Sequence, residues 1–209
     1  MLRKLLIASA VLAATSSIAF AHNYKGDYKG EAAPAPCPSY SFAAGPYIGL
    51  SVGPRTNYSN IAAVYKGFEG TLSGGYAMMM NPVFYLGGEI FVADSANIKD
   101  FKGPQQYYVN PAFTHDGVRT SWSYGISIIP GYMITDHVLA YVRAGAVRTR
   151  FSDANANATA WQLGVGAQTN VYQNWDVRGE YVYSGYGSVN FIGKPASDQF
   201  NLGVVYKFV

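Results

Sequence analysis

The sequence has little charge, one cysteine and, beyond its first 20 residues, no long hydrophobic run. Only 13% of the 209 residues are charged, which is about half the share of an ordinary soluble domain. Cys37 stands alone, so a fold held by internal disulfides is excluded. No segment after residue 21 approaches the roughly 18 apolar residues that a membrane-spanning helix needs. What remains is a chain rich in tyrosine (18) and glycine (23), without a candidate transmembrane helix.

Residue types that serve catalysis and metal binding are scarce as well. The three histidines, His22, His115 and His137, lie in unrelated segments, so no shared metal site is predicted. None of them lies on a predicted strand beside a serine, and the sequence therefore predicts no catalytic residues and no cofactor. The chain carries 15 basic and 12 acidic residues and has no basic patch, which excludes a nucleic-acid partner.

The first residues have the pattern of a targeting segment. A basic start is followed by a mostly apolar stretch from Leu5 to Phe20, and Ala19-Phe20-Ala21 fits a cleavage site between small residues. Residues 1–21 are predicted to be a secretory signal peptide, because polar residues interrupt a stretch already short for a membrane helix. Residues 22–44, with a run of proline and alanine, are predicted to be a periplasmic N-terminal tail.

Apolar residues alternate with small or polar ones over the last ten residues of the chain. A period of two over this length predicts a strand long enough, when tilted, to cross a bilayer. Seven earlier segments alternate in the same way. Eight strands are thus predicted, at residues 45–57, 67–76, 84–92, 121–128, 138–146, 161–168, 175–183 and 200–208.

The connections between these segments alternate between short and generally longer ones. Tight turns are predicted at residues 78–82, 135–137 and 172–174, and the longest loops at residues 94–118 and 185–196. An even strand number with tight turns on one side and longer loops on the other is typical of outer-membrane barrels. The fold predicted for residues 45–209 is all-β, an eight-stranded antiparallel up-and-down transmembrane β-barrel with both ends on the periplasmic side.

The charged residues of the predicted strands share the face that carries small and polar residues. We assign this face to a narrow lumen, where the charges are expected to pair, and the apolar face to lipid. A soluble lipocalin-like barrel would reverse both faces and place the charges outside. Asp176 falls on the inward face of its strand too. The predicted lumen charge cluster consists of Glu69, Glu89, Arg143, Arg178, Glu180 and Lys207.

Large aromatic residues lie on the apolar face near predicted strand ends. Barrels of this kind carry girdles of aromatic residues at both membrane interfaces. The predicted girdle residues are Trp122, Trp161, Trp175 and Tyr181.

The segments Trp175–Tyr181 and Ala140–Gly145, together with the terminal strand, resemble the small outer-membrane β-barrel proteins of Gram-negative bacteria, of the OmpA, OmpX and opacity-protein type. The resemblance covers residues 45–209 and implies an outer-membrane location, outer-membrane lipid and the barrel insertion machinery as partners, and a monomer. It also implies an assembly signal in the terminal strand, formed by Asn201, Gly203, Tyr206 and Phe208. The chain departs from the family by having Val209 after the last aromatic residue.

This architecture favours a structural or surface role without catalysis. The long loop at residues 94–118 carries four aromatic residues that could contact host-surface ligands, namely Phe101, Tyr107, Tyr108 and Phe113. An ordinary loop with no partner is the alternative. For the lumen, a salt-bridged plug is favoured over a narrow porin-like channel for small solutes or ions, because side chains fill the interior of an eight-stranded barrel.

Overall fold

The computed structural model describes Phe42 and residues 44–59, 65–96, 120–152, 155–189 and 193–208. The predicted signal peptide, most of the predicted tail, the four aromatic residues of the long loop and Val209 lie outside these ranges. Within them, no helix has the length and apolar character that a membrane crossing requires.

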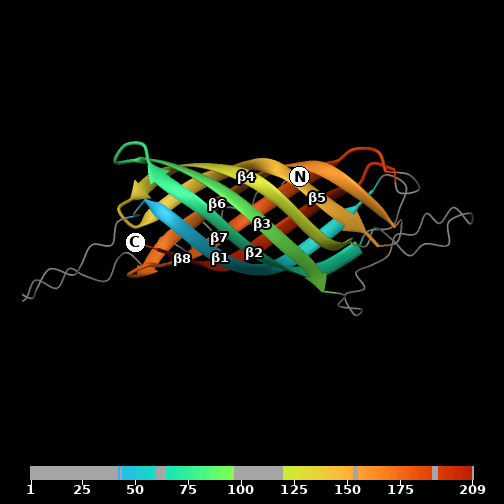
Figure 1. Cartoon of the computed structure of the whole chain (residues 1–209), viewed down its shortest axis with the longest axis horizontal. Helices are drawn as coiled ribbons and strands as arrows, with labels where there is room; N and C mark the ends of the chain where they lie inside the picture. Colours follow the sequence, from blue (N-terminus) through green and yellow to red (C-terminus); the bar gives the residue numbers. More distant parts are fainter. Residues whose placement is uncertain are drawn as a thin grey trace, which may run out of the picture. The chain divides into compact units, whose positions relative to one another are not determined.

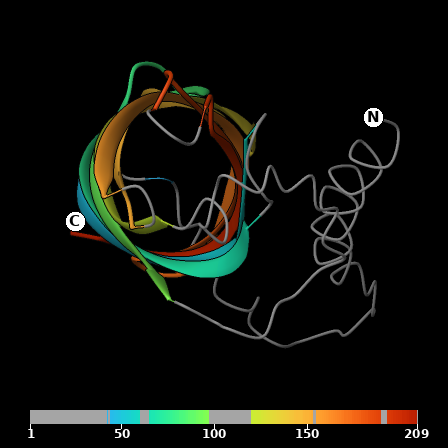
Figure 2. The same cartoon turned by 90° about the vertical axis from the view of Figure 1, so that its right-hand side faces the viewer.

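The described chain forms one closed barrel of eight strands, each hydrogen-bonded to the next in sequence (Figures 1 and 2). This confirms the predicted antiparallel up-and-down barrel. The strands are β1 (Gly45–Tyr58), β2 (Tyr65–Met79), β3 (Phe84–Ala96), β4 (Thr120–Thr135), β5 (Val138–Phe151), β6 (Ala156–Tyr172), β7 (Trp175–Tyr186) and β8 (Ala196–Lys207).

The first and last strands close the barrel. Antiparallel pairing of β1 with β8 runs from Tyr47 opposite Lys207 to Tyr58 opposite Ala196. An unpaired edge strand would expose a row of backbone donors and acceptors, which bilayer hydrocarbon cannot satisfy. Closure therefore gives every strand two hydrogen-bonded neighbours.

Three connections at one end of the barrel are short turns, and this end is called the turn side. The Asn81 side chain accepts hydrogen bonds from the backbone N–H groups of Val83 and Phe84, at 3.0 and 2.7 Å. The Thr135 hydroxyl accepts from the N–H of His137 at 3.3 Å. Gln173 takes a left-handed backbone conformation, with φ of 38°. The other end, with the connections at residues 59–64, 97–119, 152–155 and 187–195, is called the loop side.

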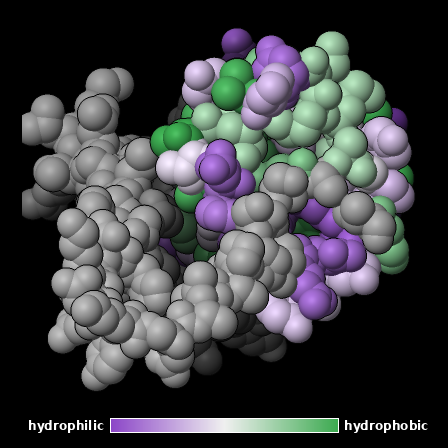
Figure 3. Space-filling model, turned by 90° about the vertical axis from the view of Figure 1, so that its left-hand side faces the viewer, coloured by the Kyte–Doolittle hydropathy of each residue, from purple (hydrophilic) through white to green (hydrophobic). Residues whose placement is uncertain are grey.

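Apolar side chains on the outer wall are exposed, as an assignment to lipid requires. Leu50 is 60% exposed and Ile90 is 65% exposed, whereas Glu89 and Phe91, the inward neighbours of Ile90, are buried. Figure 3, which looks onto the turn side, shows apolar side chains gathered over the upper part of the barrel in this view. A soluble barrel with an apolar interior and a charged exterior is thereby excluded.

Two apolar clusters lie inside the barrel, one toward each end. The turn-side cluster consists of Phe42, Tyr47, Ala77, Tyr85, Ile129, Leu139, Tyr141 and Val205. The loop-side cluster consists of Phe91, Val147, Phe151, Ala158, Ala160, Tyr186 and Val189. Phe42 precedes β1 and belongs to the segment predicted as a tail, yet only 4% of its surface is exposed.

Candidate functional site

The lumen contains eight buried charged residues, and their charges balance. The described part of the barrel buries the cations Arg55, Arg143, Arg178 and Lys207 and the anions Glu69, Glu89, Asp176 and Glu180. A charge away from water is costly unless it is paired and hydrogen-bonded. The contacts of these eight side chains therefore decide what the lumen can do.

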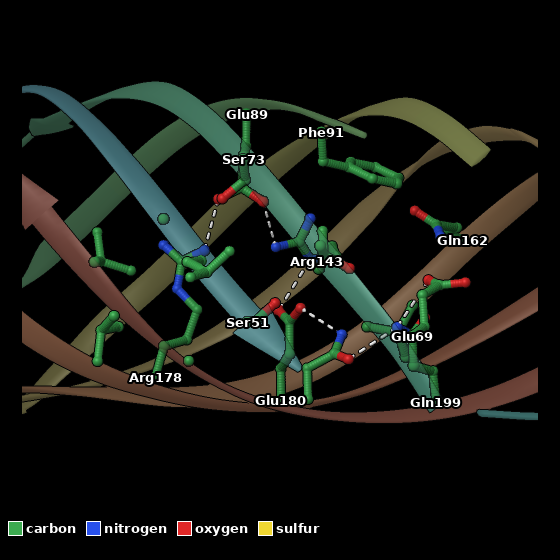
Figure 4. A pocket seen from close by; sticks show the side chains of 18 residues that line it. Ser51, Glu69, Ser73, Glu89, Phe91, Arg143, Gln162, Arg178, Glu180 and Gln199 are labelled. Carbon is green, nitrogen blue, oxygen red and sulfur yellow. Dashed lines mark hydrogen bonds and ion pairs between the residues drawn. The ribbon is translucent and has the colours of Figure 1, made fainter. Parts of the chain in front are cut away.

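A central cluster links side chains from three strands that are not neighbours (Figure 4). Glu89 of β3 accepts from Nη2 of Arg143 on β5 and from Nη1 of Arg178 on β7, each at 2.6 Å. Nε of Arg143 also lies 3.0 Å from Oε2 of Glu180 on β7. The β3 and β7 strands are four positions apart in either direction around the ring, so these contacts span the lumen from wall to wall.

Two tyrosines complete the central cluster. The Tyr47 hydroxyl donates to Oε2 of Glu89 and the Tyr141 hydroxyl donates to Oε2 of Glu180, both at 3.0 Å. Their ring centroids lie 5.5 and 5.6 Å from the guanidinium carbon of Arg178, within the range of cation–π attraction. Arg178 is thus held by a carboxylate and by two aromatic rings.

An ion pair lies toward each end of the lumen. Arg55 pairs with Glu69 on the loop side and donates from Nη2 to the Tyr186 hydroxyl at 2.8 Å. Lys207 pairs with Asp176 on the turn side, with 2.6 Å between Nζ and Oδ2. The Lys207 ammonium also lies 3.8 Å from the centre of the Phe42 ring. Phe42 therefore packs directly on the cation of the turn-side ion pair.

Three amide side chains join the central cluster to the two end pairs. Gln168 bonds to both Asp176 and Arg178, while Gln199 bonds to both Glu69 and Asn201. Asn201 donates to Oε1 of Glu180 at 3.2 Å. The resulting lumen network is continuous and runs through Lys207, Asp176, Gln168, Arg178, Glu89, Arg143, Glu180, Asn201, Gln199, Glu69 and Arg55.

Little free space remains beside this network. The cavity between Glu69, Glu89, Arg143 and Arg178 has a volume of about 30 Å³, enough for only one or two water molecules. Two buried polar atoms of its lining residues, Oε1 of Gln162 and Nη2 of Arg178, have no hydrogen-bond partner among the described residues. The site is thus a nearly filled polar interior rather than an open pore.

The structure places all six residues of the predicted lumen charge cluster on inward faces and brings them into one network. Sequence reasoning missed Arg55, and it placed Asp176 inward without including it in the cluster. Arg55 follows Pro54, but the alternation that begins at Tyr47 continues through it and would have predicted its inward position. The tyrosine and amide partners were missed too, because their contacts depend on strands far apart in sequence.

The four residues of the predicted assembly signal lie on both faces of the terminal strand. Asn201 points inward and bonds to Glu180, and a Cβ on Gly203 would lie 2.5 Å from the Leu50 carbonyl oxygen. Tyr206 and Phe208 stack edge to face on the turn side, with ring centroids 5.1 Å apart.

The four girdle residues all face outward. Tyr181, however, lies in the middle of β7 rather than near its end, and its hydroxyl donates to Asp198 at 2.5 Å.

Comparison with known proteins identifies the family of this barrel. The model of the outer membrane protein beta-barrel domain matches residues 7–208. The chain belongs to this family. Its location is accordingly the outer membrane, and the apolar outer wall of the barrel lies in lipid.

Individual proteins and solved structures are similar to the chain over most of its length. The 31 kDa outer-membrane immunogenic protein of Brucella melitensis is 23% identical over 83% of this chain and 87% of its own length. Neisserial surface protein A is 21% identical, with a TM-score of 0.53 over 79% of this chain and 99% of the other. The attachment invasion locus protein Ail of Yersinia pestis is 15% identical, with a TM-score of 0.45 over 78% of this chain and 99% of the other. At this identity, Neisserial surface protein A shows a shared fold.

The described part of the family barrel holds no cluster of three or more metal-ligating side chains. His137, the histidine within the described ranges, lies exposed in the turn between β4 and β5. His22 and His115 lie outside these ranges.

Proposed function

We propose that this outer-membrane barrel is a non-conducting structural protein of the cell surface, without catalytic activity. The observation that carries the proposal is the lumen network, which runs between the two end pairs and leaves a cavity of about 30 Å³. An ion that crosses the lumen must keep its hydration or exchange it for fixed ligands. The small cavity has no room for a hydrated ion. Fixed ligands are not free either, because the four buried cations and four buried anions already pair with each other.

The apolar clusters support the same proposal. Phe42 and Tyr85 lie in the turn-side cluster, and Phe91 and Phe151 lie in the loop-side cluster. A hydrophobic constriction opposes a continuous water column. The alternative, a narrow porin-like channel, would require side chains at both ends and in the middle to move together.

Single-channel recording in planar bilayers tests the proposal. The wild-type barrel is expected to give no steady conductance, whereas Arg143→Ala, which removes the side chain between Glu89 and Glu180, is expected to raise the leak current. Leu163→Ala, on the lipid-facing side of β6, is the control and is expected to stay closed. Steady wild-type conductance, or an Arg143→Ala barrel as tight as wild type, would contradict the proposal.

Adhesion through the extracellular loops is a second part of the proposed surface role. It rests on the longest connection, residues 97–119, whose ends are fixed by the last residue of β3 and the first of β4. The aromatic residues Phe101, Tyr107, Tyr108 and Phe113 fall in this connection, outside the described residues. A rigid barrel would present such a loop at a fixed place on the cell surface.

Replacing residues 97–119 by a short glycine–serine linker tests this part. Cells that display the shortened protein are expected to bind host cells or matrix less well than cells with the full chain. Equal binding at equal surface display would remove adhesion through this loop and leave the structural role untouched.

A further inference from the structure

The outer wall of the barrel has an apolar groove near the loop side, over β1 to β4. The groove has a volume of about 510 Å³, within the range of roughly 300–1,000 Å³ that ligand pockets span. Figure 1 shows β2, β3 and β4 side by side on this wall. The side chains and the glycine that shape it are Leu50, Gly70, Leu72, Val92, Trp122 and Tyr124.

Gly70 and two stacked aromatic rings give the groove its depth. A Cβ at Gly70 would meet nothing within 4 Å, so the missing side chain leaves open space on the wall. Trp122 and Tyr124 stack with 5.5 Å between ring centroids and 13° between ring planes. Both rings stand on the lipid-facing side, where they are 42% and 44% exposed. The groove is therefore a slot with an aromatic wall, suited to an extended apolar chain.

Two arginines lie beyond the aromatic wall. Arg148 of β5 is directly opposite Tyr124, and Arg150 lies two residues further toward the loop side. Both are exposed on the outer face. Arg150 donates to the Asn155 side chain at 2.9 Å, whereas no hydrogen bond or ion pair of Arg148 is present among the described residues. Arginine matches phosphate through parallel hydrogen bonds, so this pair offers a phosphate site beside an apolar slot.

The charges around the groove set its polarity. Asp94, opposite both Gly70 and Trp122, is the acidic residue of the groove lining. Trp122 stands between Asp94 and the arginines of β5 because β4 separates the two strands. A phosphate is accordingly drawn to the β5 side. Short turns face the periplasm in barrels of this class, so the arginines lie at the outer leaflet.

We infer that this groove is a binding site for lipopolysaccharide, the phosphorylated and multiply acylated lipid of the outer leaflet. One acyl chain lies over Gly70 between Leu72 and Trp122, and a phosphate group contacts Arg148 and Arg150. The inference uses the outer wall alone and does not depend on whether the lumen conducts.

Native mass spectrometry of the detergent-solubilised barrel, titrated with diphosphoryl lipid A, tests the site. The wild type is expected to bind lipid A about tenfold more tightly than phosphatidylglycerol, since a factor of ten corresponds to about 1.4 kcal/mol, the scale of one or two charge-assisted hydrogen bonds. The double variant Arg148→Gln/Arg150→Gln is expected to lose this preference. Dephosphorylated lipid A is expected to bind wild type and double variant alike.

The groove has its own matched pair of variants. Gly70→Leu fills the slot and is expected to weaken lipid A binding several-fold, while Gly88→Leu adds the same side chain on β3 outside the groove lining. Both glycines have open space at Cβ, so both variants should fold. Equal affinity for lipid A and phosphatidylglycerol would mean general annular lipid only and would overturn the inference. Lipid A binding that is unchanged in Gly70→Leu would overturn the placement in this groove.

Discussion

Glu89 accepts hydrogen bonds from three side chains on three different strands. Its partners are Tyr47 of β1, Arg143 of β5 and Arg178 of β7. A buried cation that loses its carboxylate keeps the full cost of having left water. Glu89 therefore stabilises the barrel mainly by compensating the buried charges of its two arginine partners, which its removal would leave without this carboxylate.

Glu89→Gln is expected to lower the free energy of unfolding by about 3–5 kcal/mol, the usual result of breaking a buried ion pair at one partner. Urea unfolding in lipid vesicles, followed by tryptophan fluorescence, measures the change. Ser73→Ala is the control, because Ser73 also points into the lumen and lies on the neighbouring strand β2. A Glu89→Gln barrel that unfolds at the wild-type urea concentration would show that the arginines find other partners.

Among the elements, β8 closes the barrel and also carries the predicted assembly signal. Its Gly203 lies opposite Ser51 of β1, and a Cβ there would approach the Ser51 Cβ to 2.5 Å. Close packing against β1 in the folded barrel is thus enough to require a glycine at this position of the predicted signal. If the glycine is needed for close packing between β1 and β8, its replacement should impair folding of the purified protein. If it is needed only for recognition by the insertion machinery, the purified protein should still fold.

Gly203→Val is expected to prevent correct closure, because the new side chain meets backbone and Cβ atoms of β1. Heat-modifiable mobility on a detergent gel measures folding, since a folded barrel migrates differently before and after boiling. Gly179→Val on β7 is the matched control, with nothing within 4 Å of its Cβ. If Gly203→Val refolds normally in detergent yet fails to reach the membrane in cells, recognition and not packing explains the glycine.

For the molecule as a whole, the period of two in the sequence was sufficient to predict the strands and their faces. The alternation places Leu50 and Ile90 outward and Glu89 inward without any knowledge of neighbours. The strand ends were predicted less well, since β6 begins at Ala156, before the predicted start, and β4 continues through Pro130 and Gly131 to Thr135. Both added ends remain paired to an adjacent strand, β6 to β5 and β4 to β3, so hydrogen bonding continues where the expected sequence pattern stops.

The contacts inside the lumen could not be predicted in the same way. Alternation puts Arg178 and Glu89 on inward faces, but their pairing depends on the stagger of strands that face each other across the barrel. The depth of Tyr181 in β7 depends on the same stagger. Phe42 precedes the alternating pattern, so no periodic signal marks it as part of the turn-side cluster.

The contacts between opposite walls also have a mechanical consequence. Arg178 on β7 reaches Glu89 on β3, and Arg143 on β5 holds both Glu89 and Glu180. These cross-lumen ion pairs are expected to resist flattening of the barrel under the lateral pressure of the surrounding bilayer. With the cross-section held in this way, the eight strand ends on the loop side are expected to keep a constant spacing, and a loop shape that depends on this spacing is expected to persist when the membrane is compressed or stretched.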